Sequence, residues 1–110
     1  MKIRSKSHRE FVASEPCIIT GYQGERGVPH HLLRITKEDD GNEAKGTASK
    51  SCDRWCVPLE FTMREVLHKY GNEKVFFANH GLDYEAVKQI ARDLSNRSPD
   101  VRIRKITKEQ

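Results

Sequence analysis

The sequence predicts a small α+β domain in which a β-hairpin packs against a well-capped helix, with further helices on either side. Two observations indicate this fold. A glycine-rich segment separates two apolar arms over residues 17–33, which is typical of a hairpin, and residues 61–71 carry helix start and stop signals. The 110 residues suffice for one domain, and with 35% hydrophobic and 33% charged residues its core must be thin.

The first half of the chain predicts a helix, a hairpin and a loop. Residues 5–14 form a short helix because His8, Phe11 and Val12 recur at helical spacing, and Pro16 ends it. In the hairpin, the β-branched stretch "CIIT" is the first arm and the second arm starts at Val28. Residues 36–51 are expected to form a polar loop too hydrophilic to pack, and "DRWCVPLE" is a brief extended segment.

The second half of the chain predicts three helices and a final strand. Thr62 and Glu65 make a capping box for the helix at 61–71, and Gly71 ends it. The side chains expected to be buried on this helix are Met63, Val66, Leu67 and Tyr70. A short helix ends at Gly81, and the next begins near Asp83. The side chains expected to be buried on it are Val87, Ile90, Ala91 and Leu94. "VRIRKI" alternates apolar and basic residues, which predicts a half-buried strand with a cationic face.

These elements form a single domain in four parts: a basic segment at 1–10, a hairpin–loop–helix core at 11–71, a helical appendix at 72–97 and a basic strand or tail at 98–110. The net charge is +4, and each basic end contributes +3, so the middle of the chain is slightly acidic. Basic ends of this kind favour contact with a polyanion such as DNA, although charged tails on a soluble protein give the same pattern.

Three cysteines are few, and their odd number cannot form a complete set of pairs, which argues against a secreted disulfide scaffold. The N-terminus lacks the apolar stretch of a secretory signal, and no apolar run is long enough to cross a bilayer. A cytoplasmic protein with reduced thiols and no membrane partner is expected.

Two adjacent histidines in "GVPHHLLR", His30 and His31, are the main candidates for chemistry. Successive strand residues point to opposite faces, so both histidines can serve one site only at a strand end or bulge. The predicted helix offers His68 near its end and Arg64 one turn earlier on the same face. A metal held between hairpin and helix would suit phosphodiester cleavage, with a neutral imidazole taking a proton from water.

The sequence resembles the HNH (His-Me finger, ββα-metal) endonuclease superfamily, most closely its short phage or prophage members. The resemblance covers roughly residues 8–82 and rests on the order of "HREFVASEPCIITG", "PHHLLR", "DRWCVPL", a helix ending in "LH", and "YGNEKVFFANHGLD". It implies a ββα-metal core and metal-dependent hydrolysis of DNA. His31 would be the general base, His30 and His68 would hold a divalent ion (Mg, Mn, Zn or Ni), and Arg64 would contact the phosphate. The residues expected to contact the nucleic-acid backbone are Arg34, Arg102, Arg104 and Lys105.

Three departures from the family pattern leave alternatives open. Thr20 and Glu60 stand where relatives carry cysteines, so the family's structural zinc cannot be carried over, although the three cysteines and a histidine remain a weak metal candidate. Met63 and Arg64 replace a histidine pair on the helix. A catalytically inactive nucleic-acid-binding accessory of phage or host recombination or replication proteins is therefore the alternative function, and a protein-interaction module is a third. Asp53 either orients a histidine or is an ordinary turn residue.

Overall fold

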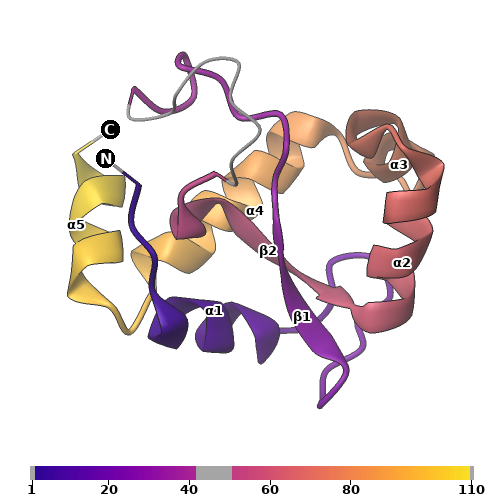
Figure 1. Cartoon of the computed structure of the whole chain (residues 1–110), viewed down its shortest axis with the longest axis horizontal. Helices are drawn as coiled ribbons and strands as arrows, with labels where there is room; N and C mark the ends of the chain where they lie inside the picture. Colours follow the sequence, from indigo (N-terminus) through magenta and orange to yellow (C-terminus); the bar gives the residue numbers. More distant parts are fainter. Residues whose placement is uncertain (1, 42–50, 110) are drawn as a thin grey trace.

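Two antiparallel strands lie at the centre of the computed structural model, and five helices surround them in the part of the chain that the structure describes, residues 2–41 and 51–109 (Figure 1). The predicted α+β class is confirmed. The elements, in chain order, are α1 (Lys6–Ala13), β1 (Gly27–His31), a 3₁₀ turn (Asp53–Trp55), β2 (Cys56–Glu60), α2 (Phe61–Tyr70), α3 (Glu73–Asn79), α4 (Tyr84–Asn96) and α5 (Val101–Lys108).

The partner of β1 is not the segment that the sequence pattern suggested. Strand β1 pairs with β2, with Gly27 opposite Glu60 and His31 opposite Cys56. Residues 17–20 form a tight turn instead of a strand, closed by a 2.9 Å hydrogen bond from the Gly21 amide to the Cys17 carbonyl. The expected hairpin at 17–33 is therefore wrong, because "CIIT" packs its side chains on the core without pairing along β1.

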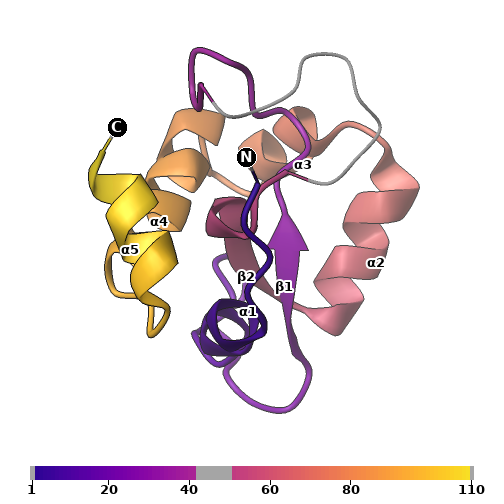
Figure 2. The ribbon, with the colours of Figure 1, turned by 60° about the vertical axis from the view of Figure 1, so that its left-hand side comes forward.

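Helices cover both faces of the sheet, so alternate side chains of its strands are buried on opposite sides (Figure 2). Cys56 packs with Val12 of α1 and Leu94 of α4 on one face. Val57 and Leu59 join Leu67 of α2 and the phenylalanines of α3 on the other. Since β2 is buried on both faces, its register cannot slip without exposing apolar side chains to water.

The predicted helices at 5–14, 61–71, 72–80 and from Asp83 onward are confirmed as α1, α2, α3 and α4. The start of α2 differs in detail, because the Glu60 carboxylate, and not Thr62, caps it by accepting from the Thr62 amide at 2.8 Å. Gly71 ends α2 with a φ of 89°, as expected for a left-handed C-terminal residue. The buried stripe of α2 is narrower than predicted, because Leu67 is buried whereas Val66 and Tyr70 are exposed.

The basic C-terminal segment is a helix and not the strand that its alternation predicted. Asp100 accepts a hydrogen bond from the Arg102 amide at 2.9 Å and so starts α5. Ile103 and Thr107, one turn apart, are the buried side chains of α5. Helix α5 packs on α4, as Figure 1 shows.

The polar loop is also more structured than predicted where the structure describes it. Asp40 is buried and accepts hydrogen bonds from Arg54 at 3.0 Å and from the Trp55 indole at 2.8 Å. The expectation for residues 42–50 lies outside the described residues. Among the helices that are described, none combines the length and the apolar character needed to cross a membrane.

Candidate functional site

The adjacent histidines lie on opposite faces of the sheet. Strand β1 is regular at His30 and His31, which pair with Val57 and Cys56 without a bulge. His31 therefore faces α1 and the 3₁₀ turn, whereas His30 faces α2 and α3. The prediction that both histidines serve one site with His68 is wrong, because strand alternation separates them.

His31 forms a close pair with Asp53. Its Nε2 lies 2.7 Å from Oδ1 of Asp53, in the 3₁₀ turn just before β2. The His31 side chain is 12% exposed and that of Asp53 is fully buried. The interpretation of Asp53 as a residue that orients a histidine is thereby supported over that of an ordinary turn residue.

Asp53 accepts hydrogen bonds on both oxygens. Oδ1 accepts from His31 and from Arg4 at 3.1 Å, and Oδ2 accepts from the Ser5 amide at 2.6 Å and from Arg9 at 2.5 Å. Burial by itself would raise the pKa of Asp53, but the hydrogen bonds from His31, Ser5, Arg9 and Arg4 together hold it far below its usual value. An ionised carboxylate can only accept, so the proton of this pair lies on Nε2 of His31.

These side chains line an open pocket of about 340 Å³ formed by Arg4, Arg9, His31 and Asp53. With Nε2 bonded to Asp53, the second ring nitrogen of His31, Nδ1, has no hydrogen-bond partner within residues 2–41 and 51–109. A neutral imidazole in this tautomer presents Nδ1 as a proton acceptor. The pocket thus combines an oriented base with two cationic side chains.

A group of three potential metal ligands adjoins the pocket. Ligand atoms of His31, Asp53 and Cys56 lie within 4.8 Å of one another. This spacing is compatible with a metal ion, but the surroundings are unfavourable for one. The four acceptor positions of the Asp53 carboxylate are in use, and two guanidinium groups lie against it. Burial, and then the Asp53 charge, raise the pKa of Cys56, so in this arrangement its sulfur is a neutral thiol.

On the other face of the sheet, His30 is paired with Glu73, a residue that was not predicted to belong to a site. Nε2 of His30 donates to Oε1 of Glu73 at 2.5 Å, and both side chains are buried. Oε2 of Glu73 accepts from the Leu33 amide at 2.8 Å and from the Tyr84 hydroxyl at 2.6 Å. Burial and the Glu73 carboxylate raise the pKa of Tyr84, so its hydroxyl stays protonated and donates. This network joins β1, α3 and α4.

His68 approaches His30 but not His31. The rings of His30 and His68 have centroids 6.3 Å apart and are tilted by 55°. Because Glu73 occupies Nε2 of His30, a metal shared by these two histidines would have to use Nδ1 of His30. Arg64 is half-buried on α2 and is not among the residues that line the His31 pocket.

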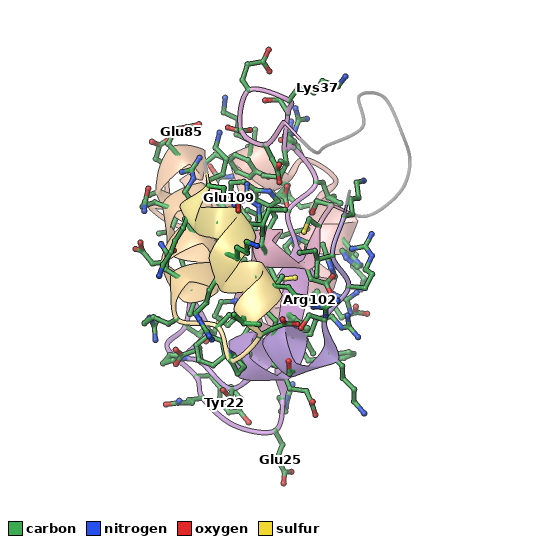
Figure 3. All side chains as sticks on the ribbon, turned by 90° about the vertical axis from the view of Figure 1, so that its left-hand side faces the viewer. Tyr22, Glu25, Lys37, Glu85, Arg102 and Glu109 are labelled. Carbon is green, nitrogen blue, oxygen red and sulfur yellow. The ribbon has the colours of Figure 1, made fainter. Side chains whose placement is uncertain are left out.

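The predicted backbone-contacting residues are divided between two regions. Arg102 of α5 lies beside the N-terminal segment, where its guanidinium donates to the Arg4 carbonyl at 3.3 Å and to Asp100 (Figure 3). Arg104 donates to the Ser98 carbonyl at 2.5 Å, and Lys105 is exposed on α5. Arg34 is exposed beyond β1 and lines a different pocket with Lys74 and Lys88.

The residues of the pocket were only partly detectable from the sequence. The basic character of residues 1–10 indicated an anion-contacting role for Arg4 and Arg9, but nothing in the pattern placed them against Asp53. Glu73 carried no signal beyond its position at the start of a predicted helix. His8, which the helical spacing placed on the apolar stripe of α1, is fully buried with Nδ1 2.8 Å from the Ser98 hydroxyl, whereas His80 is exposed.

Comparisons of this chain with protein-family models, with curated proteins and with solved structures give no match. The resemblance to HNH endonucleases therefore stays a prediction that rests on the motifs quoted above.

Proposed function

We propose that this protein cleaves nucleic-acid phosphodiesters at the pocket beside His31, in the manner of a remodelled HNH (ββα-metal) endonuclease. The observation that carries the proposal is the 2.7 Å contact between His31 and Asp53 on the floor of an open basic pocket. The order β1, β2 and α2, with the histidine pair at the end of β1, fits the family core that the sequence motifs imply.

The chemistry follows from the tautomer. Asp53 holds the proton on Nε2 of His31, so Nδ1 accepts a proton from a water molecule. The oxygen of that water forms a bond to phosphorus while the bond from phosphorus to the leaving oxygen breaks, and the leaving oxygen takes a proton from solvent or from the His31 imidazolium. Asp53 acts as a positioning residue, because its charge stabilises the imidazolium without touching the substrate.

The substrate class is supported by the charge distribution. Arg4 and Arg9 flank the pocket, and Arg102 lies next to Arg4. Cationic side chains grouped in this way bind a phosphate backbone without reading its sequence, and such binding weakens as salt is raised. DNA is the proposed partner. The free thiols of the three cysteines suit the reducing cytoplasm that the sequence predicts.

A divalent metal ion (Mg, Mn, Zn or Ni) remains part of the prediction through the family resemblance. The groups that would hold it are His31 with Asp53 and Cys56, or His30 with His68. When bound, it would stabilise negative charge on the phosphate. The hydrogen bonds that occupy Asp53 and His30 do not favour a cation in this arrangement, so no step is assigned to it.

The test is a nicking assay on supercoiled and single-stranded DNA, with each metal in turn and with a chelator. We expect His31→Ala to lower the cleavage rate by about a hundredfold or more, the usual contribution of a general base. The matched control is His80→Ala, since His80 is an exposed histidine on another element. Equal rates for wild type and His31→Ala, or intact DNA under every condition, would overturn the proposal.

A second candidate keeps the binding and drops the cleavage. It is favoured because each of the two groups that could hold a metal already has a residue bound to other partners. His30 is hydrogen-bonded to Glu73, and Asp53 is paired with Arg4 and Arg9. In that case the protein is a nucleic-acid-binding accessory, expected to act with recombination or replication proteins. Salt-dependent DNA binding by a protein that leaves DNA intact would select this candidate.

A further inference from the structure

The pocket beside His31 has two guanidinium groups where a metal-dependent site would need a cation. Arg4 and Arg9 each place a terminal nitrogen on the Asp53 carboxylate, at 3.1 and 2.5 Å. A divalent ion could bind an oxygen of this fully buried anion only by displacing one of the four donors that occupy it, and it would then lie beside at least one guanidinium cation. The positive charges of a divalent ion and of the two guanidinium groups repel one another, and this repulsion is stronger at a protein surface than in bulk water.

We propose that this pocket is a metal-free phosphate site, in which Arg9 and Arg4 bind a phosphate oxyanion beside His31. The inference rests on the proposed function for the identity of the phosphate, that of a nucleic-acid backbone. It goes further by assigning the charge-stabilising role, which the family resemblance gives to a metal, to two N-terminal arginines.

Arg9 has the donors that this role requires. One terminal nitrogen of its guanidinium contacts Asp53, and its side chain is 35% exposed. Its Nε–H and its second terminal nitrogen make no hydrogen bond to the rest of the described chain. A guanidinium carries five N–H donors in a planar fork, so Arg9 can contact Asp53 and still bind a phosphate with two parallel hydrogen bonds.

The electrostatics of the pocket also favour an anion. With His31 neutral, the lining residues carry two positive charges and the one negative charge of Asp53. The Asp53 oxygens point at their four donors, so the carboxylate is not presented to an incoming phosphate. Arg102, hydrogen-bonded to the Arg4 carbonyl, lies beside the pocket, where its positive charge is offset by its ion pair with Asp100 at 2.9 Å, so the net positive charge of the pocket comes from Arg4 and Arg9. An anion bound here lies next to the ring that would activate water.

The test uses the full chain freed of metal with a chelator and titrated with inorganic phosphate, followed by calorimetry and by two-dimensional amide NMR. We expect amide shifts to concentrate around residues 4–9, 31 and 53, and Arg9→Ala to weaken binding by about tenfold or more, the effect of losing a charged bidentate contact. Arg9→Lys keeps the charge but not the fork, so it should retain only part of the affinity. The control is Lys37→Ala, which removes one positive charge from an exposed loop well away from Arg102 (Figure 3) and should bind as wild type.

Two further titrations identify the source of the phosphate. A short oligonucleotide without terminal phosphates should bind tighter than inorganic phosphate and compete with it, which would establish an internal phosphodiester as the ligand. Binding that requires a 5′-phosphate would keep the phosphate site but overturn its assignment to the backbone.

The inference is wrong if chelated protein fails to bind phosphate while Zn²⁺ shifts, or paramagnetic Mn²⁺ broadens, the His31 resonances. It is also wrong if Arg9→Ala and Lys37→Ala bind phosphate equally. Unaltered NMR spectra of the variants outside the pocket exclude misfolding as the cause of a loss. Phosphate binding without any DNA cleavage would contradict the proposed enzymatic function and leave the phosphate site standing.

Discussion

Replacing Asp53 by asparagine is the sharpest probe of how the pocket is held together. The substitution keeps the size of the side chain but removes its charge. The new NH₂ group must replace one of the two carboxylate oxygens, so its hydrogens face either the donors of Arg4 and His31 or those of Arg9 and the Ser5 amide. Hydrogen bonds to charged groups contribute about 1.5–3 kcal/mol each. Because both arginines are partly exposed and regain water, we expect a total loss of about 3 kcal/mol in the free energy of unfolding.

The assay is urea unfolding followed by circular dichroism, repeated between pH 7 and pH 2. The folded-state pKa of Asp53 is depressed below its ordinary value of 3.8, so its contribution is fully present above pH 3.8 and declines as the pH falls further. The difference between wild type and Asp53→Asn should therefore be constant from pH 7 to about pH 5 and shrink below pH 4. At neutral pH the melting temperature should fall by roughly 10 °C.

The matched control is Asp93→Asn, the same change on the exposed face of α4, which should alter stability by less than about 0.5 kcal/mol. A loss below about 1 kcal/mol at Asp53, or a difference that persists unchanged to pH 2, would refute the view that one ionised carboxylate organises the pocket.

Two further substitutions test the framework around the site. Gly27→Ala should cost about 1–3 kcal/mol in urea unfolding, because a Cβ at residue 27 would collide with the Ala13 carbonyl of α1. Gly41→Ala should be close to neutral, since no atom of residues 2–41 and 51–109 lies near its Cβ. Equal stability of the two variants would contradict the close packing of α1 on β1. Glu73→Gln should lower the free energy of unfolding by about 2–4 kcal/mol, because it weakens the buried contacts to His30, Leu33 and Tyr84. Amide exchange in α3 should increase for the same reason, and wild-type exchange rates there would argue that these contacts do not anchor the helix.

The parts of the fold that depend on neighbouring residues were predictable. The apolar spacing of α1 and α4 and the glycines that end α2 and follow α3 all act within one or two helical turns. The strand at "VRIRKI" was the local exception. Its alternation fits a strand, but Asp100 caps a helix here, and Ile103 and Thr107 of α5 are buried one turn apart.

The candidate site was predictable only in its residue types. The sequence predicted a base role for His31 and anion contact for the basic N-terminus, and strand alternation already indicated that His30 and His31 point apart in a regular strand. It could not show that Arg4 and Arg9 lie on Asp53, because α1 and the residues before it meet the 3₁₀ turn through tertiary packing and not through spacing along the chain.

By itself, then, the sequence determined helices α1 to α4 and the alternation that separates the two histidines, since both arise from interactions between residues close in the chain, and its composition determined the net positive charge. The tertiary structure alone decided that β1 pairs with β2 across residues 32–55, that Glu73 holds His30, and that Asp53 joins His31 to two arginines. The physical reason is that ion pairs and strand register depend on burial between distant segments, and local patterns carry no information on which segments will meet.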